Sequence, residues 1–548
     1  MRLKLLLTPK DNLLRLLFAV NILIISGCQS PPAKKPNVLL IMIDDLNDCI
    51  ELFKGHPQSL TPNINKLAKS GTSFLNAHTN APMCGPSRAS MLMGIYPHKS
   101  RNFFMSPWFN NPVLKNTRTL SEQFKKEGYQ TIGTGKILHH LKRANWDHFE
   151  NHPDYGPVVF DGTQRMPHPD VPPPFSNIGS IDGSLGPLTN LAGRTTAGGQ
   201  PIQWIYGYQK EGTYPMRYRN DDDRDPTPDE KNAAWTAEKI KSLASQSLEK
   251  PFFLAVGFLR PHTPLIVPKK YFDRFPLSKI KITIKKEGDA HDTFLQVSYG
   301  QGNEFALSRG EKLFKDIIES YGSEEEGLKR WTQAYLACVA AVDDNVGQVM
   351  DALDQSRLKK NTLVVLASDH GFHMGEKDYL YKNSLWEEST RVPLIMRVPG
   401  ISIPGSKVEK VVSLIDVYPT LTDFCGLSDK TIKNQKGQAM DGHSLRALIE
   451  NPQAKNWEGE KPALTVVYAG PEFKNNPSLQ HYAIRTDRYR YILYNNGKEE
   501  LYDHQNDPSE WKNLAQDNAD YQNILLEMRD KMAMMVSPLK LNGLIIKN

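Results

Sequence analysis

Three continuous apolar runs stand out along the chain, at residues 37–43, 252–258 and 363–367. Runs without polar alternation are typical of strands that are buried on both faces of a parallel sheet. Apolar residues recur every three or four positions over 335–353, before the third run, and a second helical pattern covers 233–248, before the second run. Because helices alternate with buried strands, the pattern predicts an α/β sandwich with a large, mostly parallel central sheet.

The pattern changes at about residue 457. Three short segments then have the character of antiparallel strands, at 464–468, 482–484 and 489–494, with the segment 500–503 nearby. A helical pattern follows near 521–534. We therefore expect a main domain over 37–456 and a smaller α+β subdomain with an antiparallel sheet over 457–548.

One long stretch of the main domain, 151–230, is rich in Pro, Gly, Asp and Asn and has little periodicity. Unstructured stretches of this length inside a domain are usually functional loops. The acidic run 220–223 lies within it, and we interpret that run as a solvated loop, not as a second metal site.

The first 27 residues have the character of an export signal. Basic residues precede a short apolar stretch at 16–25, which is too short to span a bilayer. The ending Ile25-Ser26-Gly27-Cys28 resembles a bacterial lipobox, which implies cleavage before Cys28, lipidation of Cys28, and a periplasmic, outer-membrane or cell-surface location. Residues 28–36 would then be a tether. An ordinary cleaved signal peptide is the alternative.

Composition narrows the function classes. Hydrophobic residues make up 39 % and charged residues 23 % of the 548 positions, as in a folded globular protein. The single apolar segment at the N-terminus excludes a polytopic membrane protein, so we expect membrane contact only through the lipid anchor. A net charge of +6 is too small and too scattered for a nucleic-acid partner, although it suits an anionic substrate.

The remaining cysteines lack metal-binding or redox spacing. No CxxC motif occurs, so a zinc or redox site has no support, and a disulfide stays open; the residues are Cys49, Cys84, Cys338 and Cys425. Cys84 differs from the others, because it precedes Gly85-Pro86 at the predicted first turn of a helix. Arg88 follows on the same helix face, and a thiol near a cation and a helix N-terminus is not an inert core cysteine.

Acidic pairs end two of the predicted strands. Asp44-Asp45 follows the run 37–43, and Asp369-His370 follows the run 363–367. Functional groups in such sheets gather at the carboxyl ends of the strands. We therefore expect both pairs to belong to one site.

The segment around Cys84, C-G-P-S-R-A-S-x-L-x-G over 84–94, resembles the signature of the type I, formylglycine-dependent sulfatases. Further elements that match the family are Gly135-Lys136-Ile137-Leu138-His139, Arg260-Pro261-His262-Thr263-Pro264, Ser368-Asp369-His370-Gly371, Lys382, and the segment 485–491. The resemblance covers most of the chain after the signal. The Asp-His pair at 369–370 favours the branch of iduronate-2-sulfatase and the bacterial polysaccharide sulfatases, such as ulvan- or carrageenan-active enzymes.

The resemblance implies an alkaline-phosphatase-like fold and a set of site residues. A maturation enzyme would oxidise Cys84 to formylglycine (3-oxoalanine), whose hydrate attacks the sulfur of the ester. One divalent cation, with calcium suited to so many oxygens, would be bound by Asp44, Asp45, Cys84, Asp369 and His370. Sulfate oxygens and the diol oxygen would be neutralised by Arg88, Lys136 and Lys382. His262, with Lys382, would protonate the leaving sugar oxygen, and His139 would accept the proton of the second hydroxyl.

The implied activity is hydrolysis of sulfate esters in a sulfated polysaccharide or its oligosaccharides, with release of inorganic sulfate. Two alternatives stay open from the sequence. The first is a phosphonate or phosphate monoester hydrolase of the same superfamily. The second is a non-catalytic, lipid-anchored binder of sulfated glycan.

Overall fold

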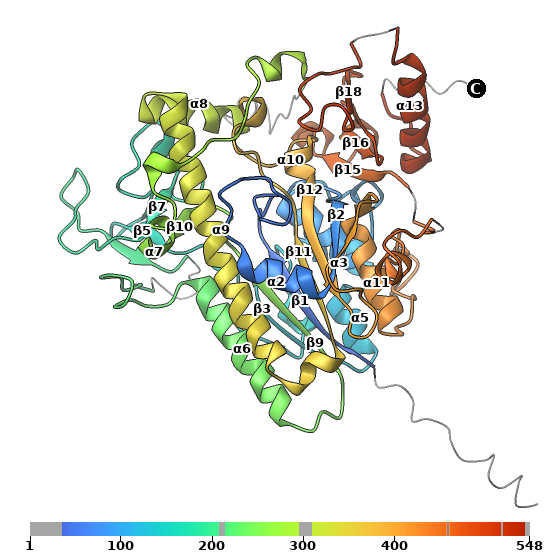
Figure 1. Cartoon of the computed structure of the whole chain (residues 1–548), viewed down its shortest axis with the longest axis horizontal. Coiled ribbons are helices and arrows are strands. Elements are labelled where there is room, and N and C mark those ends of the chain that lie inside the picture. Colours follow the sequence, from blue (N-terminus) through green and yellow to red (C-terminus); the bar gives the residue numbers. More distant parts are fainter. Residues whose placement is uncertain are drawn as a thin grey trace, which may run out of the picture. The chain divides into compact units, whose positions relative to one another are not determined.

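A nine-stranded sheet forms the centre of the part of the chain that the structure, a computed structural model, describes; these residues are 35–207, 214–294, 309–455, 457–459, 461–516 and 519–542. The strand order is β13-β2-β12-β11-β1-β9-β3-β4, and β14 pairs with β2 (Figure 1). Their bounds are β1 (Asn37–Ile43), β2 (Thr72–His78), β3 (Gln130–Gly135), β4 (His148–Phe149), β9 (Phe252–Phe258), β11 (Thr362–Ser368), β12 (Arg391–Arg397), β13 (Ser406–Val408) and β14 (Val412–Ser413). Within this described sheet β12 alone runs antiparallel, so the predicted mostly parallel sheet is confirmed.

Strand β1 explains why its sequence is a continuous apolar run. It pairs in parallel with β11 on one side and β9 on the other, so both of its edges are covered. Alternate side chains enter two different hydrophobic cores: Leu39 and Ile41 face one layer of helices, and Leu40 and Met42 face the other. A strand covered on both faces has no position at which a polar side chain could reach water.

Helices cover both faces of the sheet (Figure 1). One layer, which shares a core with Leu39 and Ile41, consists of α2 (Pro62–Ser70), α6 (Pro228–Ser245) and α9 (Glu324–Asp354). The opposite layer contains α3 (Cys84–Met93), α5 (Leu120–Lys126) and α11 (Val417–Phe424). Shorter helices are α4 (Pro97–Ser100), α7 (Lys269–Phe272), α8 (Arg309–Tyr321), α10 (Glu387–Thr390) and α12 (Arg446–Glu450).

The helices begin where their capping residues are. A capping box joins Thr227 to Glu230 at the start of α6, with Pro228 at the first helical position. Helix α9 begins after Ser323, whose hydroxyl accepts the amide of Glu326, so it starts earlier than the apolar spacing alone predicts.

The predicted C-terminal sheet is confirmed. It has the order β15-β16-β17-β18 and packs against α13; the bounds are β15 (Ala463–Val467), β16 (His481–Arg485), β17 (Tyr489–Leu493), β18 (Glu499–Asp503) and α13 (Gln522–Val536). The domain boundary near 457 stays a prediction. The hydroxyl of Thr465 donates to the Thr79 carbonyl at 2.6 Å, and the amide of Val466 donates to the Asn80 carbonyl at 2.9 Å. This sheet therefore holds the segment that leads into α3.

The stretch 151–230 is mostly irregular, as expected, but it contains short strands that sequence periodicity does not reveal. A small sheet has the order β6-β5-β8, and β7 pairs with β10; the bounds are β5 (Val158–Phe160), β6 (Arg165–Met166), β7 (Leu185–Pro187), β8 (Gln203–Ile205) and β10 (Leu265–Val267). In the acidic run, Asp223 pairs with the exposed Arg217 and Arg219, as in a solvated loop.

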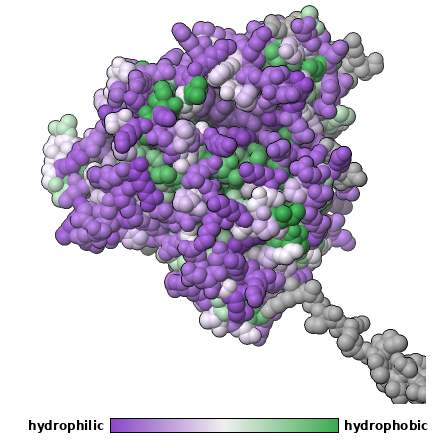
Figure 2. All heavy atoms as spheres, viewed as in Figure 1, coloured by the Kyte–Doolittle hydropathy of each residue, from purple (hydrophilic) through white to green (hydrophobic). Residues whose placement is uncertain are grey.

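The surface is largely hydrophilic in the view of Figure 2. None of the helices in the described part of the chain combines the length and the apolar content needed to cross a bilayer. The predicted signal peptide over 1–27 and the lipidation site Cys28 lie outside the described residues. The four described cysteines are buried and form no disulfide among themselves.

Candidate active site

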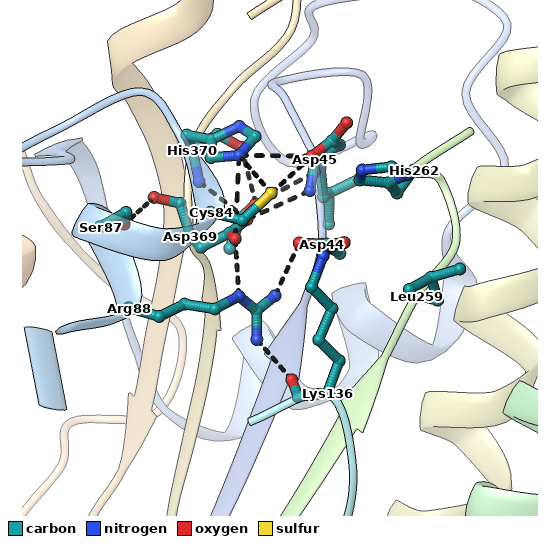
Figure 3. A network of polar contacts seen from close by, with 12 residues as sticks. Asp44, Asp45, Cys84, Ser87, Arg88, Lys136, Leu259, His262, Asp369 and His370 are labelled. Carbon is teal, nitrogen blue, oxygen red and sulfur yellow. Dashed lines mark hydrogen bonds and ion pairs between the residues drawn. The ribbon is translucent and has the colours of Figure 1, made fainter. Parts of the chain in front are cut away.

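The two acidic pairs lie side by side at one edge of the sheet. Strands β1 and β11 are parallel and in a register that places Ile43 opposite Ser368, so the residues that follow both strands leave the sheet at the same level. The amide of Asp45 donates to a carboxylate oxygen of Asp369 at 3.2 Å, which ties the two strand ends together. The structure thus brings the two pairs into one cluster (Figure 3).

Cys84 is the first residue of α3 and points into this cluster (Figure 3). Its Sγ lies 3.3 Å from Nε2 of His370, 3.6 Å from Nζ of Lys382 and 3.9 Å from Oδ1 of Asp45. The side chain is fully buried. Lys382 therefore contacts the thiol together with His370, and Arg88 does not.

Arg88 binds carboxylates. Its Nη2 donates to Asp44 at 2.8 Å and its Nε to Asp369 at 2.7 Å, and all three side chains are fully buried. Nη1 donates to the carbonyls of Lys136 and Ile137. Every guanidinium nitrogen is thereby used, and the planar fork fixes the distance between the ends of β1 and β11.

Two lysines complete the neutralisation of the aspartates. Lys136 donates to Asp44, and Nζ of Lys382 lies 2.8 and 2.7 Å from the two oxygens of Asp45. Both lysines are almost completely buried. Their charges are therefore held by aspartates in the structure, whereas the family resemblance implies that they face sulfate.

A close backbone approach positions Lys136. Gly135 ends β3 with φ +73°, and a Cβ there would lie 2.1 Å from the carbonyl oxygen of Gly257 in β9. A Cβ on Gly257 would in turn lie 2.1 Å from the Lys136 carbonyl. Only glycine fits both positions, which gives the Gly-Lys element its structural reason.

The two predicted catalytic histidines differ in their surroundings. Nδ1 of His262 donates to the Thr263 carbonyl at 2.5 Å, and a ring nitrogen lies within 4.8 Å of ligand atoms of Asp44, Asp45 and Cys84. Nδ1 of His139 is buried and has no hydrogen-bond partner among the described residues. The structure therefore brings His262 into the cluster and leaves His139 at its margin.

Both histidines are held in the neutral form. Burial, followed by Lys382, keeps the pKa of His262 well below its ordinary value. Burial, followed by Lys136, lowers the pKa of His139 to about 3. Neither ring is a ready proton donor at neutral pH in this state.

The charges around the thiol are unevenly distributed. Burial raises the pKa of Asp45 to about 8, against the opposing effect of Lys382. Burial lowers the pKa of His370, but Asp369 and Asp45 outweigh it and raise that pKa to about 9. Burial and Asp44 raise the pKa of the Cys84 thiol, yet Lys136, Lys382 and His370 together bring it below the ordinary value of a cysteine.

The cluster fits a divalent cation. Ligand atoms of Asp44, Cys84, Asp369 and His370 lie within 4.8 Å of one another, and all four residues are buried. Nδ1 of His370 donates to the Gly371 carbonyl at 3.0 Å, which leaves Nε2 for a ligand, as in many metal-binding histidines. The pKa of Asp45 is raised chiefly because burial disfavours its charged form, an effect that a bound cation would offset.

Several side chains of the site escape prediction from the sequence. The ring of Tyr155 packs edge-on against His262, with ring centroids 5.2 Å apart, and Nζ of Lys136 lies 4.9 Å from the Tyr155 centroid. Asp182 accepts the hydroxyl of Thr263 at 2.5 Å and binds Arg309. Tyr155 and Asp182 come from the stretch 151–230, where no motif or periodicity marks individual residues.

Comparison with protein families gives two matches. The model described as "Sulfatase" matches residues 36–427, and the model described as "N-sulphoglucosamine sulphohydrolase, C-terminal" matches residues 375–537. A protein named "Sulfatase" from Formosa agariphila is 34 % identical over 498 residues, which cover 88 % of this chain and 83 % of that protein. Iduronate 2-sulfatase from Mus musculus is 29 % identical and covers 84 % of each chain.

Solved structures share the fold. The structure of BT4656 in complex with D-glucosamine-2-N,6-O-disulfate has a TM-score of 0.63 and 21 % identity, and the match covers 92 % of this chain and 97 % of that one. The phosphonate monoester hydrolase of Agrobacterium radiobacter has a TM-score of 0.64 and 22 % identity, with 92 % and 95 % covered. At this level of identity the two matches establish the alkaline-phosphatase-like architecture.

Proposed function

Because the chain belongs to the sulfatase family of sulfuric ester hydrolases, we propose that it is a carbohydrate sulfatase that acts through a formylglycine made from Cys84. The observation that carries the proposal is the position of Cys84. Its side chain lies at the start of α3, against His370 and Lys382, at the edge where the carboxylates of β1 and β11 gather. A sulfur or oxygen nucleophile at this point has cations on several sides.

As its hydrate, formylglycine would supply one hydroxyl that attacks the sulfur and a second whose loss of a proton expels sulfate. The net reaction is the ester plus water giving the sugar alcohol and sulfate. Residue 84 is held for this role by the first turn of α3 and by the hydroxyl of Ser87, which donates to the Asp369 carbonyl at 2.5 Å. Lys382 brings positive charge to the place where charge on the sulfate oxygens increases.

The histidines divide the proton transfers. His262, beside Lys382, would hold the proton for the leaving sugar oxygen, because a bound sulfate next to the ring adds negative charge and raises its depressed pKa. His139 would accept the proton of the second hydroxyl, since its neutral ring has an unpartnered Nδ1. Arg88 and Lys136 hold Asp44 and the strand ends in place.

We also propose calcium as the cation of the site. A bound dication would supply charge neutralisation and lower the pKa of the attacking hydroxyl. Three carboxylates, Asp44, Asp45 and Asp369, make the ligand set hard and rich in oxygen, which favours calcium over softer metals.

A sulfated polysaccharide, or an oligosaccharide derived from one, is the proposed substrate. Support comes from the relatives, since a mammalian iduronate 2-sulfatase matches 84 % of this chain. Carrageenan, ulvan and glycosaminoglycans all carry sulfate esters on sugar residues. We further propose that the chain is exported as a lipoprotein anchored at Cys28, in the periplasm or outer membrane, and that a maturation enzyme acts on Cys84; the N-terminal sequence and the motif at 84–94 support this.

An assay of paired esters tests the activity. The enzyme, co-expressed with a sulfatase-maturation enzyme, is offered 4-nitrophenyl sulfate and 4-nitrophenyl phosphate, and then defined carrageenan, ulvan and glycosaminoglycan oligosaccharides. We expect hydrolysis of the aryl sulfate and of at least one sulfated oligosaccharide. Faster hydrolysis of the phosphate would favour a phosphate or phosphonate monoester hydrolase, and binding without turnover would favour a non-catalytic glycan binder.

A further inference from the structure

A pocket away from the cluster around Cys84 lies between the end of α4, with the segment that follows it, and the C-terminal subdomain. Its volume is about 680 Å³, and its walls are residues 99–104, 106–107 and 110–113 on one side and Tyr468, Lys474 and Asn475 on the other. It shares no residue with the cluster around Cys84. Pockets at the seam between two structural units are common ligand sites.

The charge of this pocket is uniformly positive. Lys99, Arg101 and Lys474 line it, and no carboxylate belongs to its lining among the described residues. Lys99 is neutralised by Asp441. Neither Arg101 nor Lys474 forms an ion pair within the described part of the chain, so two positive charges remain available to an anionic ligand.

Aromatic and amide groups complete the lining. Phe104 keeps 38 % of its surface exposed, and its ring lies 5.0 Å from that of Tyr468 across the seam. Asn110 and Asn475, both exposed, add side-chain amides to the lining. An apolar ring face beside amides and free cations is suited to a sugar ring that carries hydroxyl groups and a negative charge.

One wall of the pocket is held in shape by its own hydrogen bonds. Nδ2 of Asn111 donates to the Ser100 carbonyl at 2.9 Å, and its Oδ1 accepts the amides of Val113 and Leu114. Arg101 has φ +57°, a left-handed conformation that is strained for a residue with a side chain and persists only where the surroundings fix it. This wall therefore keeps its shape through contacts of the chain itself.

The same segment contacts the candidate active site. A Cβ on Gly85, the residue after Cys84, would lie 3.0 Å from Sδ of Met105 and 3.3 Å from the carbonyl oxygen of Phe104. Nε1 of Trp108 donates to the carbonyl of His140, next to His139, at 2.9 Å. The segment that forms this wall of the pocket therefore packs directly against the residue that follows Cys84.

We infer that this pocket binds a negatively charged sugar residue, sulfated or carboxylated, that is linked to the sugar whose ester is being hydrolysed. The inference rests on the proposed function and narrows it to chains of several sugars, because a small ester would leave the pocket empty. Arg101 and Lys474 would bind the anionic group, and Phe104 would pack against the ring.

The test compares long and short substrates. Arg101→Asn removes one positive charge of the pocket, and Asn suits the left-handed backbone at this position. Lys474→Gln removes the second charge. The matched control is Lys69→Gln on α2, which lies in the opposite helical layer. We measure kcat and KM on 4-nitrophenyl sulfate and on carrageenan, ulvan and glycosaminoglycan di- and hexasaccharides. Binding of the same hexasaccharides to Cys84→Ala is measured with and without the two pocket substitutions.

We expect each pocket substitution to raise KM for the cleaved hexasaccharide roughly tenfold, the size of one charge-assisted contact, with kcat unchanged. Kinetics on the aryl sulfate, and all kinetics of Lys69→Gln, should match the wild type. Unchanged hexasaccharide KM and binding in the double variant, with aryl sulfate still hydrolysed, would overturn the pocket and leave the proposed function standing. Failure to hydrolyse any sulfate ester would overturn both.

Discussion

Two buried clusters of charge in this molecule have similar composition and opposite character. One is the site around Cys84. The other, which we call the joint cluster, consists of Glu387, Arg485, Arg490, His504 and Glu510 and links α10 to the C-terminal sheet. Each contains two or more acids and a histidine close enough to hold a metal ion.

The joint cluster is fully neutralised. Burial would raise the pKa of Glu387, but Arg485 and its other cationic neighbours hold it well below the ordinary value. Burial would likewise raise the pKa of Glu510, yet Arg490 and His504 lower it to about 2. At the site, by contrast, the pKa of Asp45 rises to about 8. The cations of the joint cluster keep its acids charged, whereas burial in the site disfavours the charged form of Asp45, which a bound cation would offset.

The largest expected effect is the loss of activity when the nucleophile is removed, because only the site around Cys84 contains one. Cys84→Ala should lower kcat on aryl sulfate by ~10⁴-fold or more, because removal of a nucleophile abolishes its covalent route. The midpoint of urea unfolding should change little, since Ala also suits a helix interior. Retention of more than a tenth of the wild-type rate would contradict the comparison.

The next effect comes from two arginines that each bridge a pair of buried acids. Arg88→Met and Arg490→Met should each cost about 3–5 kcal/mol of the free energy of unfolding, because each leaves uncompensated buried carboxylates. Only Arg88→Met should also lower kcat, by ~10²-fold or more, since Arg88 holds Asp44 and Asp369 at the site.

Urea unfolding and steady-state kinetics of the folded fraction provide the two readouts. Arg88→Lys is the control that keeps the charge but loses the fork. A loss of kcat in Arg490→Met as large as in Arg88→Met would show that the two clusters do not differ in the way we describe.

Calcium binding should distinguish the two clusters by a smaller effect, on the stability of the fold. Calcium added to the demetallated protein at about 100 times its Kd should stabilise the fold by about 2.7 kcal/mol, because it binds only the folded state. Asp45→Asn should reduce this gain, and Glu510→Gln in the joint cluster should not. Thermal unfolding, followed by calorimetry, measures the stabilisation by calcium. An equal loss of this stabilisation in both variants would contradict the assignment of the calcium site to the cluster around Cys84.

The smallest expected effect is a loss of folding stability at low pH. Because the pKa of Glu510 is lowered on folding, its charged form adds stability that is present above its ordinary pKa and is lost as the pH falls toward 2. Wild-type stability should therefore fall between pH 4.5 and 2, and more steeply than that of Glu510→Gln. Urea midpoints across this window provide the measurement, and parallel slopes would refute it.

The sequence predicts the sheet well because its central strands are covered on both faces. The run 252–258 coincides with β9 and the run 37–43 with β1, and the third run lies inside β11. Continuous apolar runs and turn residues are local features of the sequence, so they can be recognised without the tertiary structure. The short strands of 151–230 leave no such signal, since each contributes only two or three residues to an edge.

The sequence predicts which residues belong to the site better than it predicts which of them are in contact. The resemblance and the strand ends lead to Cys84, Asp45 and His370, which the structure brings within 4 Å of one another. That Lys382, and not Arg88, contacts the thiol depends on how a distant loop returns to the sheet. Tyr155 is missed for the same reason, because nothing local marks it as a neighbour of His262.

The most direct test of the account is the mass of the peptide that contains residue 84, isolated from enzyme with measured sulfatase activity. Conversion of the thiol to an aldehyde removes the sulfur, and the hydrated and free forms of the peptide differ by one water molecule. We predict that the aldehyde fraction across preparations is proportional to kcat on aryl sulfate. Full activity in enzyme whose residue 84 is an unmodified cysteine would contradict the account.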